Sequence, residues 1–367
     1  MSNINRKQFI KKSAIAAAGG SSLLAACAQD NSASGSKPID AGKTFKWRMV
    51  TTWPPHFPIL GEGADKIAKT IEAMSGGRIK IQVYGGGELV PALESFDAVS
   101  AGTAQMGHSA SYYWAGKAPA SQLFTSVPFG MNTQQTYAWL LYGGGLKLWE
   151  ELYSQFNLLP LPGGNTGCQM GGWFNKEIKS VDDLQGLRMR IPGIGGKIIS
   201  KAGGSAVLSP GGEIYTNLER GVIDATDWVG PFHDWKMGFH KIAKYYYYPT
   251  FAEPTGVMEV MINKSAFEEL PQDLQAIVKQ AVAACNIDML SEFEAKNSEY
   301  LEKIRTETKV QVKRFPDDVV EAFRKYAKEA LDELAASDAF SKKVLESYNK
   351  FKQSISGWTD IADKNYD

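Results

Sequence analysis

Hydrophobic and polar residues follow two periods along the first part of the chain. Residues 45–52 and 78–84 alternate with period two and predict strands, whereas the apolar positions of 60–74 recur at helical spacing. A second helix is predicted over 93–100, after a glycine turn at 85–87. Strands that alternate with helices in this way predict a largely parallel sheet with helices packed on both of its faces.

The pattern starts again after a proline- and glycine-containing stretch at 159–164. The elements predicted in this second part are strands at 169–175, 188–191, 224–229 and 256–263, and a helix at 197–202. The aromatic run at 245–248 is interpreted as lining the surface of a lobe. From 271 to 346 the pattern is mainly helical, with one strand candidate at 310–315. The sequence therefore predicts an α/β protein of two lobes with a long helical C-terminal tail, and ligands of such folds bind at strand ends or between lobes.

Residues 1–26 predict an export signal that is not part of the folded body. Residues 6–12 carry four positive charges, and the apolar run 13–26 that follows is too short to span a bilayer. The five residues that end in Cys27 resemble a bacterial lipobox, in which this cysteine is lipidated. The alternative is a plain secretory signal in which Cys27 is incidental. Lys7 stands where a twin-arginine signal has its second arginine, so two export routes stay open.

Composition and charge narrow the choice of protein class. The 367 residues include 40 Lys+Arg and 40 Asp+Glu; without the signal, 36 basic residues face 40 acidic ones, which gives a net charge of about −4. With no basic stripe, a nucleic-acid partner is not expected, and three cysteines cannot form a disulfide framework. Residues 27–44 are small and polar and predict a flexible tether. No later stretch is apolar enough to enter a membrane, so the N-terminal lipid is the only expected anchor.

The sequence has none of the common catalytic motifs. Neither a nucleophile elbow nor an HExxH zinc motif is present, and the glycine-rich segment 193–197 lacks the Ser or Thr of a P-loop. The histidines are expected to be solvated or structural: His56, His108, His233 and His240. A binding protein is favoured, and the alternative is a secreted metal-dependent enzyme that uses Asp227 or Glu253 as a base.

Polar residues gather at the ends of the predicted strands and beside Pro/Gly breaks, where a cleft would lie. Arg190 stands near the end of the strand at 188–191, and a guanidinium there can hold a carboxylate in a bidentate pair. Gln169, Asp227 and Glu253 offer the hard oxygen atoms that suit Ca²⁺ or Na⁺. On pattern alone, these residues are candidates for a carboxylate-binding group and for a cation site, and the spacing does not show whether they lie together.

Four segments resemble the solute-binding proteins of tripartite ATP-independent periplasmic (TRAP) transporters, and the resemblance covers nearly all of 45–355. These are GGGELVPALESFDAVSAGTAQMGHS (85–109), VDDLQGLRMRIPG (181–193), GEIYTNLERGVIDATDWVGP (212–231) and the helical segment from 264. Within this family the chain looks closest to the branch that binds 2-oxo acids or lactate, because of Gln169, the Asp-Trp pair at 227–228 and Glu253.

The resemblance implies a periplasmic binding protein fold, in which two α/β lobes close about a hinge over an organic anion. It places the crossovers near 164 and 253. Lobe I would then comprise 45–164 and 254–295, and lobe II would comprise 165–253 and 296–367 with the C-terminal helices. The implied partners are the membrane subunits of a TRAP transporter, and a homodimer through the C-terminal helices is expected. A sensor-associated binding protein is an alternative with the same fold and ligand.

The resemblance also implies roles for individual residues. Arg190 matches the arginine that clamps the ligand carboxylate. The cation, Na⁺ or Ca²⁺, would be held by Gln169, Asp227, the Trp228 backbone carbonyl and Glu253; related proteins often have Glu at 227, so its identity stays open. Further substrate contacts are expected from a hydroxyl of Tyr112 or Tyr113, from the apolar walls Trp53 and Trp228, and from Asn165.

Overall fold

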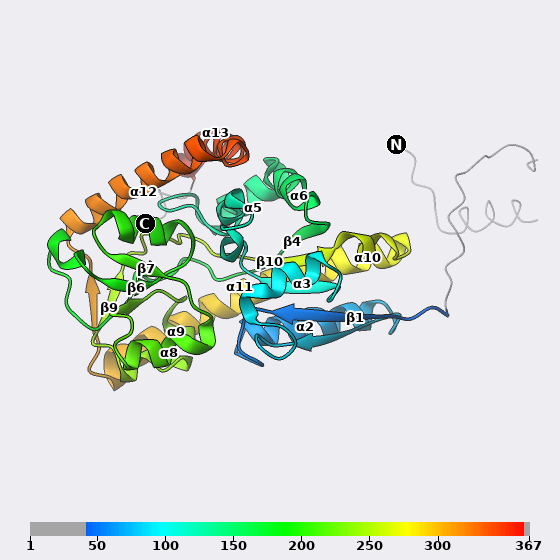
Figure 1. Cartoon of the computed structure of the whole chain (residues 1–367), viewed down its shortest axis with the longest axis horizontal. Coiled ribbons are helices and arrows are strands. Elements are labelled where there is room, and N and C mark those ends of the chain that lie inside the picture. The colour runs from blue at the N-terminus through cyan, green and yellow to red at the C-terminus, as the bar shows by residue number, and fades with distance from the viewer. Residues whose placement is uncertain (1–41, 363–367) are drawn as a thin grey trace, which may run out of the picture. The chain divides into compact units, whose positions relative to one another are not determined.

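A computed structural model describes residues 42–362; the expected export signal, Cys27 and the tether up to residue 41 lie outside this range. Two sheets with their covering helices form the two lobes of an α/β protein (Figure 1). The sheet of lobe I has the strand order β2-β1-β3-β10-β4. Its strands are β1 (Phe45–Thr51), β2 (Ile79–Tyr84), β3 (Met106–Ser109), β4 (Leu158–Asn165) and β10 (Val257–Asn263).

The sheet of lobe II has the order β11-β9-β5-β8-β6-β7. Its strands are β5 (Gly172–Phe174), β6 (Arg188–Arg190), β7 (Ser205–Val207), β8 (Ala225–Thr226), β9 (Tyr245–Tyr248) and β11 (Gln311–Arg314). Both sheets are mixed rather than largely parallel: β10 runs antiparallel to β3 and β4, and β5 runs antiparallel to β8 and β9. Strands β5 and β10, which make these antiparallel pairs, each follow a crossing of the chain from one sheet to the other.

Helices cover both lobes. Those packed around the first sheet are α2 (Leu60–Met74), α3 (Ser95–Ser100), α4 (Gln122–Thr125), α5 (Thr133–Tyr142), α6 (Gly145–Ser154) and α10 (Lys264–Glu268). Those beside the second sheet are α7 (Gly193–Lys201), α8 (Gly211–Glu219) and α9 (Pro231–Lys236). The 36-residue helix α11 (Gln272–Glu307) packs against α2 and β4 of lobe I and against α9 of lobe II, so it supports both lobes (Figure 1).

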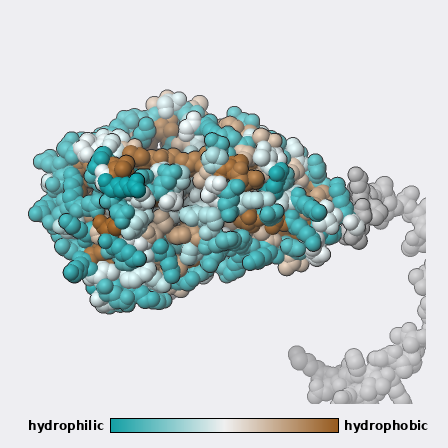
Figure 2. Space-filling view, turned by 60° about the horizontal axis from the view of Figure 1, so that its bottom comes forward, coloured by the Kyte–Doolittle hydropathy of each residue, from teal (hydrophilic) through white to brown (hydrophobic). Residues whose placement is uncertain are grey.

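The last two helices lie against different lobes. Helix α12 (Asp317–Ser337) packs on α7, whereas α13 (Ala339–Ile361) packs on α5 and α6 (Figure 1). The extent of each lobe, with 296–367 assigned to lobe II, stays a prediction. No helix among residues 42–362 has the length and the hydropathy that crossing a membrane requires. The face shown in Figure 2 is mainly hydrophilic, with apolar residues in small separate patches.

Four strands lie where the sequence analysis predicted none, namely β3, β4, β7 and β9. The stretch 159–164 lies within β4, where Pro160 and Pro162 are tolerated because β4 is an edge strand that pairs only with β10. The aromatic run forms β9, an inner strand between β11 and β5, in which Tyr246 and Tyr247 are fully buried. The interpretation of this run as a lobe surface was therefore wrong.

A buried carboxylate lies in the middle of the first sheet. Glu259 of β10 accepts hydrogen bonds from Trp114 Nε1 (2.5 Å) and from the Tyr153 hydroxyl (2.7 Å). Burial raises the pKa of Glu259 to about 7, although both donors oppose the rise. The ionised form is therefore a cost to the fold, which two hydrogen bonds offset only in part.

We expect Glu259→Gln to melt higher than the wild type above about pH 7 and at the same temperature near pH 4. Because the folded pKa of about 7 exceeds the unfolded value of 4.5, unfolding releases a proton and the wild type loses stability as pH rises between these values. The loss is on the order of 3 kcal/mol. Melting curves from pH 4 to 9 test this expectation, and a difference that is independent of pH would contradict it.

Candidate functional site

The polar cluster begins where two parallel strands of lobe II end. Arg190 is the last residue of β6 and Asp227 follows β8 directly, and β6 pairs with β8 in parallel, so their carboxyl ends meet at one edge of the sheet. Arg190 is 1% exposed. Its Nη1 donates to the Asp227 carbonyl (3.1 Å) and its Nε to the Ser209 carbonyl (3.3 Å). The backbone thereby fixes the direction of the guanidinium.

Lobe I supplies aromatic side chains to the same place. Tyr112 and Tyr113 lie in a short 3₁₀ helix after β3, and Arg190 Nη2 donates to the Tyr113 hydroxyl at 3.1 Å. Trp53 follows β1, and its ring centroid lies 6.3 Å from that of Tyr113. From lobe II, Trp228 packs its ring 5.3 Å from the guanidinium carbon. The expected arginine, tyrosines and tryptophans therefore come together from both lobes.

The two crossovers between the sheets provide the remaining oxygen atoms. Gln169 N–H donates to the Glu253 carbonyl (3.1 Å), and Gln169 Nε2 donates to Glu253 Oε2 (2.6 Å). Gln169 Oε1 and Asp227 Oδ2 are both buried and have no hydrogen-bond partner. Buried acceptors without a donor are rare in folded proteins, and a metal ion satisfies such oxygen atoms without any proton.

The charges of the buried carboxylates Asp227 and Glu253 also indicate a bound cation. Burial raises the pKa of Asp227 to about 7, with Arg190 opposing the rise and Asp234 adding to it. Burial and the Asp227 charge raise the pKa of Glu253 well above its usual value, again against Arg190. One guanidinium cannot balance two buried carboxylates and an anionic ligand. The donor set therefore fits a hard cation such as Na⁺ or Ca²⁺.

The Tyr112 hydroxyl is set up as a donor. Burial raises its pKa well above the usual value, and the charge of Glu253 adds to this effect. The phenol therefore keeps its proton at all physiological pH values.

The expected cation ligands are not all acidic or imidazole side chains. Among residues 42–362, no three His, Cys, Asp or Glu side chains come together as metal ligands. A cation at this place would therefore also need the Gln169 amide oxygen and the Trp228 backbone carbonyl oxygen.

Asn165 is an expected site residue for which the structure shows neither a hydrogen bond nor a ring contact to the other expected residues of this cluster. Its Oδ1 accepts from the Gly167 N–H (2.8 Å), and its Nδ2 donates to Thr255 Oγ1 (3.0 Å). Both contacts lie within the crossovers. A direct role of Asn165 in ligand binding stays a prediction.

Three neighbours of the cluster were not found from the sequence. Thr166 accepts a hydrogen bond from Gln169 Nε2 (3.1 Å), and the Ser209 hydroxyl is buried without a partner beside Arg190. Phe57 packs edge-on against Trp228, with ring centroids 6.2 Å apart. The only sequence signal for Thr166 and Phe57 is their nearness to Gln169 and to Trp53.

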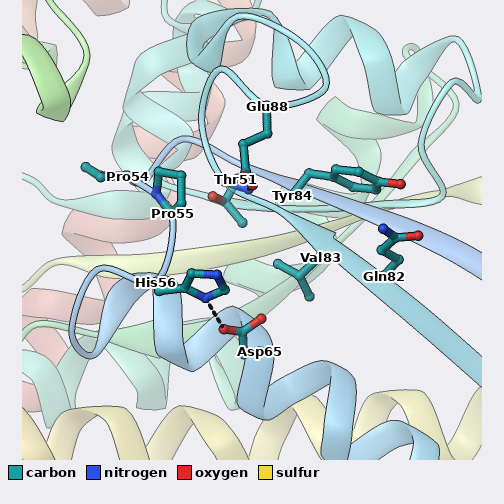
Figure 3. Close-up of a pocket in the computed structure, with 11 residues that line it drawn as sticks. Thr51, Pro54, Pro55, His56, Asp65, Gln82, Val83, Tyr84 and Glu88 are labelled. Carbon is teal, nitrogen blue, oxygen red and sulfur yellow. Dashed lines mark hydrogen bonds and ion pairs between the residues drawn. The ribbon is translucent and has the colours of Figure 1, made fainter.

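Of the two cavities described next, the first lies beside the cluster and the second lies apart from it. One of about 510 Å³ is lined by Tyr112, Tyr113, Ile191 and Lys197 among others, and so opens beside the cluster. Another of about 300 Å³ lies at the carboxyl ends of β1 and β2, where His56 contacts Asp65 at 3.2 Å (Figure 3). None of the side chains that line this second cavity is a buried group without a partner, so it shows no sign of a built binding site.

Comparison with known proteins gives a consistent set of relatives. The family described as bacterial extracellular solute-binding protein, family 7, matches residues 49–338. A monocarboxylate 2-oxoacid-binding periplasmic protein of Nostoc sp. (strain PCC 7120) is 42% identical over 367 residues, which cover 99% of this chain and 98% of the relative.

Solved structures of similar proteins contain small acids and cations. A TRAP periplasmic solute-binding protein from Pseudoalteromonas atlantica, with bound sodium and pyruvate, is 45% identical at a TM-score of 0.86, covering 88% of this chain and 98% of its own. One from Colwellia psychrerythraea, with bound calcium and pyruvate, is 44% identical at a TM-score of 0.85, with coverages of 88% and 99%. One from Bordetella bronchiseptica, with calcium and picolinate, is 38% identical at 0.86, with coverages of 88% and 96%.

Proposed function

Because the chain belongs to bacterial extracellular solute-binding protein family 7, the family of TRAP solute-binding proteins, we propose that it captures a small 2-oxo monocarboxylate together with a cation. The resemblance seen in the sequence motifs is confirmed at the level of the family. The protein is a solute-binding protein and not an enzyme, so the alternative of a metal-dependent enzyme was wrong. Pyruvate is the simplest acid of the proposed class in which the oxo group is a ketone.

One observation carries the proposal. A fully buried guanidinium lies beside two buried carboxylates, and two buried oxygen atoms, Gln169 Oε1 and Asp227 Oδ2, lack any donor. This arrangement suits a ligand that brings a carboxylate for Arg190 and an adjacent oxygen for a cation. A 2-oxo or 2-hydroxy acid has both groups on neighbouring carbons.

Each residue then has a defined task. Arg190 binds the ligand carboxylate, and the protonated Tyr112 hydroxyl donates to it. Gln169, Asp227, Glu253 and the Trp228 carbonyl would hold Na⁺ or Ca²⁺, which supplies positive charge to the ligand oxygens. Trp53 and Trp228 exclude water, which strengthens every charged contact within the cleft. The similar structures with bound sodium and pyruvate, and with bound calcium and pyruvate, support this assignment.

The position of the site between the lobes suits delivery to a transporter. Its groups come from both sheets, so a bound ligand links lobe I to lobe II and stabilises the arrangement in which they meet. We infer that the membrane subunits of a TRAP transporter recognise this liganded form. Lipidation of Cys27, anchoring outside the cytoplasm and a homodimer through the C-terminal helices belong to the same proposal.

The test is thermal melting of protein that has been freed of ligand and metal by unfolding and refolding. We expect pyruvate to raise the melting temperature by roughly 5 °C at 100 times its Kd, and only with Na⁺ or Ca²⁺ present. Methyl pyruvate is the matched control, because it keeps the keto group and lacks the carboxylate charge. Equal shifts with pyruvate in a sodium-free buffer that contains chelator, or with the ester, would contradict the proposal.

A further inference from the structure

The amide group of Gln169 is held in one orientation. Gln169 is 5% exposed, and both hydrogens of its Nε2 are used: one donates to Glu253 Oε2 (2.6 Å) and the other to Thr166 Oγ1 (3.1 Å). Its Oε1 is therefore the atom left without a partner. If the amide rotated by half a turn, Oε1 would instead face a carboxylate and a hydroxyl oxygen.

Thr166 meets this amide as an acceptor because its own proton is engaged elsewhere. The Thr166 hydroxyl donates to the Gly167 carbonyl at 3.1 Å, which leaves its lone pairs for Gln169. Its backbone N–H donates to the Gly256 carbonyl at 3.0 Å, and the side chain is buried. The hydrogen bonds thus run in one direction, from Gln169 through Thr166 to the backbone of the crossover.

The backbone of Gly256 lies directly against the Thr166 hydroxyl and the Gln169 amide, and it leaves no space there for a side chain. A Cβ atom at Gly256 would lie 2.4 Å from Thr166 Oγ1, 2.8 Å from Gln169 Nε2 and 3.4 Å from Glu253 Oε2. The first two distances are shorter than real Cβ contacts, so any side chain at this position would displace the hydroxyl or the amide. This space is an observation independent of the hydrogen bonds.

We propose that Thr166 is a positioning residue of the cation site: its hydroxyl fixes which atom of the Gln169 amide faces the cation. This inference rests on the proposed function. Without the hydroxyl, one amide hydrogen loses its acceptor, and the rotated amide, which presents N–H to the cation, becomes accessible. Groups that orient a metal ligand typically change metal affinity by about 10- to 100-fold when they are removed.

The experiment compares Thr166→Val, which keeps the shape and removes the hydroxyl, with Thr166→Ser, which keeps the hydroxyl. Thr136→Val is the matched control, because Thr136 of α5 is also buried and its hydroxyl donates to the Met131 carbonyl (3.4 Å), away from the crossovers. Calorimetric titrations use Ca²⁺ alone, Na⁺ alone, and pyruvate at several cation concentrations. We expect Thr166→Val to bind cation about 10- to 100-fold more weakly, and Thr166→Ser and Thr136→Val to match the wild type.

The division between cation and acid affinity identifies the role. For a positioning residue, saturating cation returns the pyruvate affinity of Thr166→Val to near the wild-type value. A general weakening of the crossover would lower that affinity at every cation concentration, and this result would overturn the inference. So would wild-type cation affinity in Thr166→Val, or a Thr166→Ser protein as weak as the valine variant.

Two further outcomes keep the test decisive. If Thr166→Val does not fold, Gly256→Ala replaces it, and the added methyl should weaken cation binding in the same way; unchanged binding would overturn the inference. If the wild type binds pyruvate without any cation, the proposed function itself fails. Cation-dependent binding by the wild type with no effect of either variant would remove only the role of Thr166.

Discussion

Arg190→Ala should bind pyruvate roughly one hundred- to several thousand-fold more weakly than the wild type in Na⁺ or Ca²⁺. The guanidinium is 1% exposed and is the nearest positive group to Asp227 and Glu253. Removing one partner from a buried charged contact costs about 3–5 kcal/mol, and each 1.4 kcal/mol corresponds to a factor of ten. Isothermal titration with pyruvate at saturating cation measures the loss.

Two lysine variants separate the shape of the guanidinium from its charge. Arg190→Lys keeps a positive charge but cannot bond in a fork to a carboxylate, so we expect an intermediate loss. Arg188→Lys is the matched control on the same strand: Arg188 is half exposed and pairs with Asp224 at 2.7 Å, away from the cluster. Wild-type affinity in Arg190→Ala, with a normal melting curve, would remove the arginine clamp from the proposal.

The sequence predicted those elements best whose pattern is local. Strand β1, helix α2 and strand β2 begin and end within one residue of the predicted bounds, because period two and period 3.6 are visible in seven to fifteen residues. Strand β10 was predicted as closely for the same reason. The direction of β10 was not, because strand direction depends on where the chain re-enters the sheet, which no local pattern records.

The elements that were missed are held by contacts between distant parts of the chain. Strand β4 contains two prolines and two glycines, which locally favour a loop, and it exists because β10 pairs with its whole length. Strand β9 is a run of tyrosines whose polar ends are satisfied far away; the Tyr246 hydroxyl donates to Asp234 (2.7 Å). Helix α7 starts four residues early, within a glycine-rich segment that was interpreted as turns.

The same distinction applies to the site. Residue type and position at strand ends were enough to select Arg190 and Asp227, since parallel neighbours β6 and β8 must end at the same edge. The sequence could not show that Tyr113 reaches Arg190 from the other lobe, or which oxygen atoms would lack donors. Those features depend on how the lobes pack and on side-chain rotation, and the Gln169 amide is the clearest case.

Asp227→Asn should have two opposite effects, a loss of cation affinity and a gain in the stability of the metal-free protein. Asparagine keeps an oxygen but removes the charge, so we expect cation binding to weaken by roughly 30- to several thousand-fold, since truncating a buried charged partner costs about 2–5 kcal/mol. Without metal, the wild type buries Asp227 close enough to Glu253 for its charge to raise the Glu253 pKa, and only the Arg190 guanidinium opposes this rise. Removing one of the two like charges should therefore raise the melting temperature at pH 8.

Asp224→Asn is the matched control for this prediction, because Asp224 lies three residues earlier and pairs with the exposed Arg188. We expect it to leave cation affinity unchanged and to lower stability by at most about 1 kcal/mol. The two effects of Asp227→Asn should appear together, since both follow from one buried charge that is kept for binding at a cost to the fold. A variant that melts higher and still requires the cation at wild-type concentrations would show that Asp227 is buried near the site without holding the metal. A variant that loses the cation and melts lower would show that Asp227 supports the fold by contacts other than its charge.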